Sequence, residues 1–221
     1  ELDDIVARFP DPRSPAALPE NPARDGRYRL AGWWYCLFER HWSLRGMTNA
    51  LTDYYTDPAS VHRLYRALTD FYAGLIDRIA SELGADGFFT SDDLGTQTGT
   101  FFGEAIFDEF FAPYYRELAE RAHARGMHFW LHACGNIEPF IPKLIDLGLD
   151  VIHPIQKYAM DERQVARRYG GGICVCAGFD VQRIIPFGTP GEVRAEVRHL
   201  VDTWHRLEGR MLFSADNVIN G

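Results

Sequence analysis

The segment FWLHACGN, residues 129–136, changes from strand to loop character within eight positions. Its first half is rich in aromatic and apolar residues, and the small and polar residues that follow predict a turn before a helix begins at Ile137. Side chains alternate between the two faces of a strand, so His132 and Cys134 are expected on the same face. In parallel β/α sheets, binding sites lie where the strands end. An imidazole and a thiol at such a strand end predict half of a site for a soft divalent metal such as zinc.

The same order of a strand followed by a helix recurs along most of the chain. Short apolar runs predict strands at residues 29–35, 88–91, 128–132, 151–153, 173–177 and 211–214. Helical spacing and stop signals predict helices at residues 37–46, 47–55, 60–83, 104–124, 137–147, 161–169 and 190–206. We expect Ser60 and Thr189 to cap two of these helices, and Pro113 to kink or split another.

Strands that alternate with helices, without hairpin turns between them, indicate an α/β fold with a parallel sheet. The right-handed winding of such units favours a (β/α)8 TIM barrel, here with about six of its eight β/α units. An open doubly wound sheet is the alternative, but the Gly-x-Gly-x-x-Gly turn that would support it is absent from the sequence. Residues 1–27 contain five prolines and are expected to form an irregular arm, with the partial barrel domain at residues 28–221.

A barrel that lacks two strands exposes two sheet edges, and such edges are normally covered. We therefore expect residues outside this chain, or a partner chain in a homo-oligomer, to cover them. A monomer of these 221 residues that folds cooperatively would contradict this expectation.

The composition predicts a soluble, globular protein of the cytoplasm. With 46% hydrophobic residues the chain can bury a sizeable core, and its net charge of -8 argues against a nucleic-acid or anionic membrane surface. No apolar run approaches the ~20 residues of a membrane span, and the acidic N-terminus is unlike a signal peptide. Four scattered cysteines are typical of a reduced compartment.

Polar residues follow the predicted strands from the second strand onward, and parallel strands would bring them to one rim. They are Asp92, Asp93, Gln97, His132, Cys134, Asn136, His153, Gln156, Asp180, Gln182, Asp216 and Asn217. Structural roles are an alternative for several of them: the Asp pair can start a loop, the later aspartates can cap helices, and His153 is interpreted as structural. For His132 and Cys134 two functional interpretations remain open, a metal-bound thiolate or an activated nucleophile.

Four motifs, by their order and spacing, resemble the uroporphyrinogen decarboxylase superfamily, and its methyltransferase-like branch most closely. They are DDLGTQ at residues 92–97, HACGN at 132–136, GFDVQ at 178–182 and PFGTPGEV at 186–193. FER at 38–40 and LRG at 44–46 agree as well, so the resemblance extends over roughly residues 30–220. It implies a TIM barrel, and a protein that is longer than this chain at both ends.

The methyltransferases of this superfamily bind zinc through a His-x-Cys pair and a later cysteine. His132 and Cys134 match the pair, and Asp216 stands near the place of the later cysteine, so the resemblance implies zinc held by these three residues. It also implies a methyl donor or acceptor that is either a small molecule or a corrinoid on a partner protein. Asp92 and Asp93 are then expected as catalytic groups opposite the metal. The expected substrate-binding groups are Gln97, Asn136, Gln156, Asp180 and Gln182.

These motifs leave three functions to be compared. The preferred one is a zinc-assisted methyltransferase that moves a methyl group between a corrinoid or small methylated substrate and a nucleophile. The second is a uroporphyrinogen decarboxylase-type lyase for a tetrapyrrole acid, which needs no metal and whose Arg-rich N-terminal motif is not in this chain. The third is a non-catalytic barrel that binds a corrinoid or a partner protein. Zinc that is lost in His132→Ala or Cys134→Ser would separate the first function from the other two.

Overall fold

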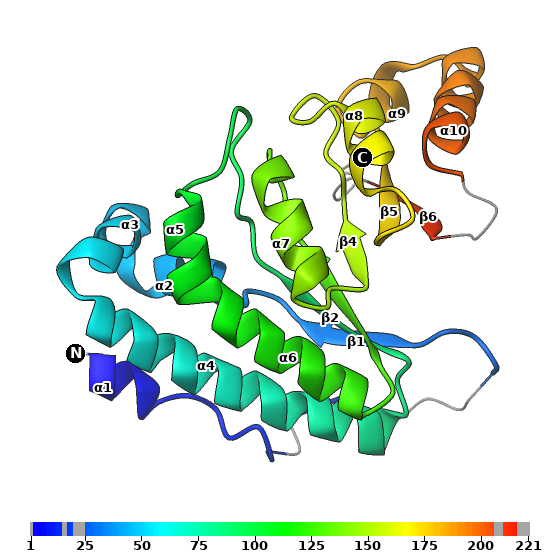
Figure 1. The fold of residues 1–221 in the computed structure, drawn as a ribbon. Helices are drawn as coiled ribbons and strands as arrows, with labels where there is room; N and C mark the ends of the chain where they lie inside the picture. Colours follow the sequence, from blue (N-terminus) through cyan, green and yellow to red (C-terminus); the bar gives the residue numbers. More distant parts are fainter. Residues whose placement is uncertain (1, 15–16, 20–24, 206–209, 216–221) are drawn as a thin grey trace. The chain divides into compact units, whose positions relative to one another are not determined.

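The computed structural model describes residues 2–14, 17–19, 25–205 and 210–215, in which strands and helices alternate (Figure 1). Within these residues, one sheet has the strand order β1-β2-β3-β4-β5-β6, which is the order of the chain. The strands are β1 (Leu30–Trp33), β2 (Gly87–Ser91), β3 (His128–His132), β4 (Val151–His153), β5 (Cys174–Phe179) and β6 (Met211–Ala215). The pairs β1–β2, β4–β5 and β5–β6 are parallel. The predicted α/β fold, with consecutive β/α units as in a TIM barrel, is confirmed.

Most helices lie close to their predicted positions, whereas the short helix at residues 184–187 was not predicted. The helices are α1 (Leu2–Val6), α2 (Phe38–Arg45), α3 (Met47–Thr56), α4 (Pro58–Arg78), α5 (Glu104–Ile106), α6 (Ala112–Ala124), α7 (Ile141–Asp146), α8 (Glu162–Tyr169), α9 (Ile184–Phe187) and α10 (Pro190–Trp204). Two π-helical turns, η2 (Ile79–Leu83) and η3 (Phe107–Phe111), and one 3₁₀ turn, η4 (Glu138–Phe140), complete the set that the structure describes. None of these described helices is both long and apolar enough for a bilayer span.

Three sequence signals at helix ends can be compared with the structure. Ser60 was the wrong N-cap for α4, because Pro58 takes the first helical position and the Asp57 side chain accepts the Ser60 N–H at 3.2 Å. The split predicted at Pro113 is confirmed: α5 ends before η3, and Pro113 lies in the first turn of α6. The Thr189 cap of α10 is confirmed as a capping box with Glu192.

The chain divides into two compact units. The first consists of Glu1–Asp92 and Phe102–Trp130, and the second of Asp93–Phe101 and Leu131–Gly221. The domain boundary expected after residue 27 stays a prediction, and α1 is the helix that the structure places within that arm.

In the first unit, α4 and α6 lie side by side (Figure 1). The Arg66 guanidinium donates to both carboxylate oxygens of Glu117 at 2.6 and 2.7 Å, which joins the two helices. Beneath them is an aromatic core of fully buried rings, Phe38, Tyr65, Phe107, Phe111 and Tyr115. These five aromatic side chains therefore serve packing.

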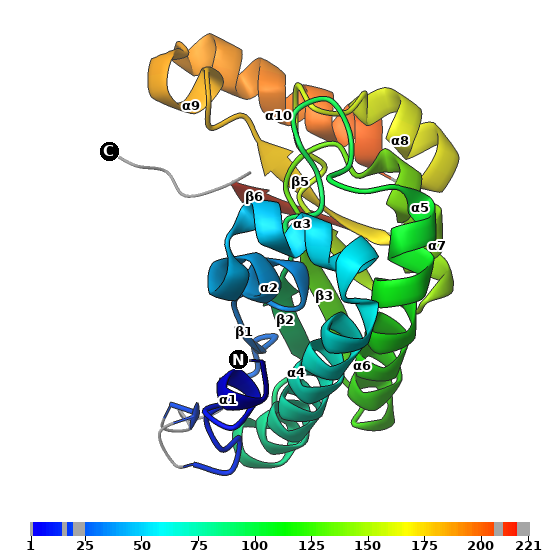
Figure 2. The ribbon, with the colours of Figure 1, turned by 90° about the vertical axis from the view of Figure 1, so that its left-hand side faces the viewer.

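In the second unit, β4, β5 and β6 pair in parallel, with Val151 opposite Cys174 and Val175 opposite Met211. Helix α10 lies next to α8, and His199 Nε2 donates to Glu162 Oε2 at 2.9 Å between them (Figure 2). Because the strands are parallel, their C-terminal ends lie at one edge of the sheet. The polar groups at that edge form the candidate site.

Candidate metal centre

Three potential metal ligands of the second unit, Asp93, His132 and Cys134, lie together. His132 is the last residue of β3, Cys134 follows two residues later, and Asp93 comes from the loop after β2. His132 Nε2 is 3.3 Å from Cys134 Sγ and 3.5 Å from Asp93 Oδ1. All three ligand atoms lie within 4.8 Å of one another. The structure thus brings the predicted His-x-Cys pair together with an aspartate that was expected to act opposite the metal.

The separations suit a tetrahedral zinc ion. Zinc binds nitrogen and oxygen at about 2.0–2.2 Å and sulfur at about 2.3 Å, so tetrahedral ligand atoms are roughly 3.3–3.6 Å apart. Two of the three separations, 3.3 and 3.5 Å, lie in this range, and the third, between Cys134 Sγ and the Asp93 carboxylate, is at most 4.8 Å. One nitrogen, one sulfur and one oxygen donor are also ligand types that zinc accepts, and three protein ligands leave a fourth position open. The residues present therefore fit the metal.

His132 is nearly buried and is oriented by a second histidine. Its Nδ1 lies 2.7 Å from Nδ1 of His153, whose Nε2 lies 3.1 Å from Ser214 Oγ. Burial lowers the pKa of His132 to about 4, and the nearby His153 adds to this effect, so the ring is neutral at pH 7. If His132 donates from Nδ1 to His153 and His153 donates from Nε2 to Ser214, the lone pair of His132 Nε2 faces Cys134 and Asp93. Metal binding at Nε2 requires this arrangement of protons.

Removal of the second histidine tests this arrangement. His153→Ala deprives the His132 Nδ1–H of its acceptor, and we expect zinc to bind about tenfold more weakly, as measured by competition with a chromophoric chelator. His153→Asn, whose Oδ1 can accept the same proton, should restore most of the affinity. His199→Ala removes an imidazole of the same unit that pairs with Glu162 instead, and should leave the affinity unchanged. Equal affinities in all three variants would contradict the role of His153.

The loop that carries Cys134 is fixed by three consecutive backbone N–H groups. The N–H of Cys134 donates to Asp93 Oδ1 at 2.7 Å, that of Gly135 to Gln156 Oε1 at 2.5 Å, and that of Asn136 to Thr96 O at 2.7 Å. Gly135 has φ +86, a conformation that glycine adopts without strain. These bonds hold the cysteine in place relative to the loops after β2 and β4.

The predicted substrate-binding residues mostly hold loops together. Gln97 Nε2 donates to Tyr158 O at 2.7 Å, Gln156 holds Gly135, and Asn136 Oδ1 accepts the Glu138 N–H at 3.2 Å. Gln182 is exposed. Their roles in substrate binding stay predictions.

Asp180 is buried and fully engaged within the same edge. Its Oδ2 accepts from the Tyr158 hydroxyl at 2.6 Å, and its Oδ1 accepts the N–H groups of Gln182 and Arg183 at 2.9 Å each. Burial would raise the pKa of Asp180, but the hydrogen bonds from Tyr158 and the two N–H groups outweigh it and hold the pKa below its usual value. Asp180 is thus an ionised anchor for Tyr158, and its substrate-binding role stays a prediction as well.

Asp92 makes its contacts within the first unit, where it is completely buried. Oδ2 accepts from the N–H groups of Leu37 and Phe38 and from the Tyr115 hydroxyl, and Oδ1 accepts from the Glu39 N–H. The carboxylate therefore caps the N-terminus of α2. Its catalytic role stays a prediction. Asp216, the predicted third zinc ligand, lies outside the described residues.

Two residues of the centre were missed as functional residues, His153 and Ser214. Each lies near the end of a strand at the same edge as His132. That position was the only signal in the sequence, and it did not distinguish His153 from a structural histidine. The register between neighbouring strands determines which side chains at the strand ends touch each other.

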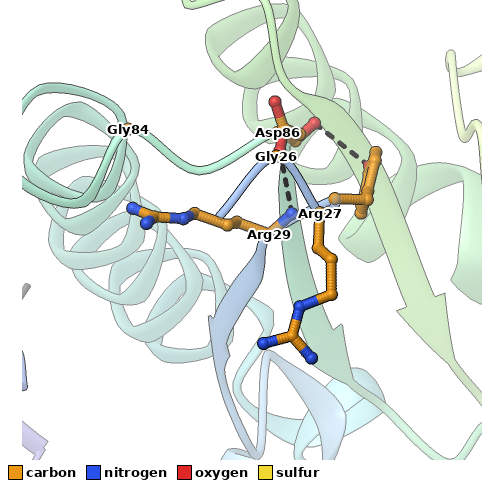
Figure 3. A pocket seen from close by; sticks show the side chains of 6 residues that line it. Gly26, Arg27, Arg29, Gly84 and Asp86 are labelled. Atoms are coloured by element: carbon orange, nitrogen blue, oxygen red, sulfur yellow. Dashed lines mark hydrogen bonds between the residues drawn. The ribbon is translucent and has the colours of Figure 1, made fainter. Parts of the chain in front are cut away.

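A hollow of about 340 Å³ lies in the first unit at the N-terminal ends of β1 and β2 (Figure 3). Asp86 there accepts the Arg29 N–H at 2.8 Å. The side chains of Arg27 and Arg29 point away from each other, and they donate to Asp25 and to the Leu83 carbonyl respectively. Because its charged groups do not converge, we assign no ligand to this hollow.

Comparisons with known proteins agree with this architecture. No curated protein sequence matches the chain. A solved structure described as a methyltransferase from Methanosarcina mazei matches with a TM-score of 0.61 and 13% identity, over 76% of this chain and 47% of that one. At this identity the likeness shows the fold alone, and the chain spans about half the length of that protein. The sequence model of the family described as Uroporphyrinogen decarboxylase (URO-D) matches residues 40–214, well over half of the chain. The chain thus belongs to the uroporphyrinogen decarboxylase family.

Proposed function

We propose that this chain carries the metal centre of a methyltransferase of the uroporphyrinogen decarboxylase family. Asp93, His132 and Cys134 would hold zinc, and the reaction would move a methyl group between a corrinoid or small methylated substrate and a nucleophile. The observation that supports this most directly is the approach of an oxygen, a nitrogen and a sulfur donor to within 4.8 Å of one another. The fold likeness to a protein described as a methyltransferase agrees with it.

Bound zinc would supply Lewis acidity, which lowers the pKa of a coordinated thiol, alcohol or water and makes a nucleophile available at neutral pH. Asp93, His132 and Cys134 would hold the ion with three ligands, which would leave a place for that group. Burial and His153 keep His132 neutral, so that its Nε2 can bind a cation without first losing a proton. In the transfer, the electron pair of the nucleophile forms the new bond to the methyl carbon, and the donor keeps the pair of the bond that breaks.

The identity of the third ligand can be tested directly. We expect Asp93→Ala to lower zinc affinity by at least about tenfold, because Asp93 also holds the Cys134 N–H at 2.7 Å. Asp216→Ala should change the zinc affinity little if Asp93 is the third ligand. Zinc content by elemental analysis and affinity by chelator competition check both variants. Loss of zinc in Asp216→Ala alone would assign the oxygen ligand to Asp216 instead, and absence of zinc from the unmodified chain would refute the proposal.

A lyase acting on a tetrapyrrole acid is the second candidate, favoured by the description of the family whose model matches. It would work without a metal. Decarboxylation of a tetrapyrrole acid by metal-free protein, unchanged in Cys134→Ser, would support it against methyl transfer.

The partners follow from the proposed reaction. A small methylated molecule, or a corrinoid on a separate protein, would be the methyl donor or acceptor. We also propose the cytoplasm as the compartment. The chain covers 47% of the matched methyltransferase. The methyl transfer proposed here would therefore be the activity of a protein that is longer than this chain.

A further inference from the structure

Tyr158, in the turn between β4 and α8, has an unfavourable backbone conformation. Its φ is 69°, in the left-handed region that residues with a Cβ rarely adopt. The side chain remains 42% exposed, so burial in a core does not offset this strain. Specific contacts must therefore hold the residue in place.

Three contacts hold it, two from the loop after β5 and one from the loop after β2. Its hydroxyl donates to Asp180 Oδ2 at 2.6 Å, and the Arg183 guanidinium lies 4.3 Å from the centre of its ring. Its carbonyl accepts the Gln97 side-chain N–H at 2.7 Å. Asp180 is 1% exposed and is itself fixed by two backbone N–H groups. An exposed tyrosine is thus anchored on a rigid, buried carboxylate.

The same turn places Gln156. The Gln156 carbonyl accepts the N–H groups of Ala159 and Met160 at 3.2 Å each, so the backbone closes around Tyr158. The Gln156 side chain accepts the Gly135 N–H at 2.5 Å. Gly135 directly follows Cys134. Gln156 thus links the turn at Tyr158 to the loop that carries Cys134.

We propose that Tyr158 is a positioning residue for the metal centre: its anchored, left-handed turn aims Gln156 at Gly135 and so holds Cys134 facing His132. The proposal rests on the proposed metal function for its effect on affinity, but the geometric link from Tyr158 to Gly135 can be measured without metal. Residues that orient ligands from outside the coordination sphere typically change metal affinity by about 10–100-fold.

Tyr35 provides a matched control in the first unit. It has φ 65°, is 40% exposed, lies beside the guanidinium of Arg40 at 5.4 Å, and accepts a hydrogen bond at its carbonyl from Tyr72. None of these contacts involves Asp93, His132 or Cys134. A glycine in place of either tyrosine relieves the same backbone strain, so a general loss of stability does not explain a difference between the two variants.

The experiment compares Tyr158→Gly, Tyr158→Phe and Tyr35→Gly in the full chain, with cobalt(II) as the probe. We expect the cobalt affinity of Tyr158→Gly to fall about tenfold and its thiolate-to-cobalt absorption band to weaken. Tyr158→Phe keeps the ring beside Arg183 and loses the bond to Asp180, so its affinity should fall by a smaller factor. Tyr35→Gly should match the unmodified chain. The Gly135 amide, measured in metal-free protein, should exchange its hydrogen about tenfold faster in Tyr158→Gly alone.

Equal affinity, equal absorption and equal Gly135 exchange in Tyr158→Gly and Tyr35→Gly would overturn the positioning role. A chain that binds no cobalt in any form would refute the proposed metal centre instead. In that case the hydrogen exchange rate of the Gly135 amide still tests the positioning role of Tyr158. Faster exchange in Tyr158→Gly supports the role, and an unchanged rate refutes it.

Discussion

Cys134→Ser is expected to abolish stoichiometric zinc binding, with an affinity at least about a hundredfold lower than that of the unmodified chain. Changes outside the coordination sphere cost about 10–100-fold, and loss of a direct ligand costs more. A serine hydroxyl keeps its proton at neutral pH, whereas a cysteine readily binds zinc as the thiolate. The remaining pair, His132 and Asp93, then has only two donors for the ion.

Thermal or urea unfolding with and without zinc provides the measurement. At a zinc concentration of about 100 times the dissociation constant, binding should add about 2.7 kcal/mol to the free energy of unfolding, and this gain should fall to about 0.4 kcal/mol or less in Cys134→Ser. Cys174→Ser is the matched control, since Cys174 begins β5 and is not one of the three clustered ligands. Zinc retained by Cys134→Ser, or lost equally in Cys174→Ser, would refute Cys134 as a ligand.

Asp92→Ala is expected to destabilise the protein by about 4 kcal/mol. The change leaves three backbone N–H groups and the Tyr115 hydroxyl without their acceptor in a fully buried place, and each unsatisfied buried donor costs about 1–3 kcal/mol before water enters. Asp161→Ala removes the cap of α8 at an exposed position and should cost only about 1 kcal/mol. Urea unfolding compares the two variants. Similar costs would show that the Asp92 cap is no stronger than an ordinary surface cap.

The cost of Asp92→Ala should also depend on pH. Burial raises the pKa of Asp92 from 3.8 to about 6, although hydrogen bonds from Tyr115 and the three N–H groups oppose the shift. Between about pH 4 and 6 the folded state therefore holds a proton that the unfolded state has lost, and this contribution to stability is lost as the pH rises through 6. The alanine variant has no such group. The difference in unfolding free energy between the two proteins should be larger at pH 4.5 than at pH 7.5, and the reverse order would contradict the raised pKa.

The sequence carried enough information for the fold because each strand is a short apolar run and each helix has its own periodicity and end signals. Those features are local. They also predicted the contact between His132 and Cys134, which follows from the alternation of side chains along β3. The cap of α4 was placed at Ser60 instead of Asp57, although an aspartate followed by proline is a good helix start.

The rest of the site depends on contacts between distant segments. The sequence placed Asp93 at the strand ends, but only the path of the loop after β2 brings its carboxylate to the cysteine N–H. His153 touches His132 from the neighbouring strand, and that pairing cannot be deduced from either strand alone. Gln97 and Asp180 were expected to bind substrate, yet both hold Tyr158, a residue with no signal of its own in the sequence.

The main chains of Gly95 and Gly135 lie in direct contact beside the centre, and this contact limits which positions can be changed when the protein is engineered. A Cβ on Gly135 would lie 2.2 Å from the carbonyl carbon of Gly95, and a Cβ on Gly95 would lie 2.7 Å from the nitrogen of Asn136. Both obstacles are main chain, so no compensating substitution elsewhere can create room. Libraries for laboratory evolution of a new specificity should keep this pair constant and diversify exposed positions such as Thr98 and Gln182.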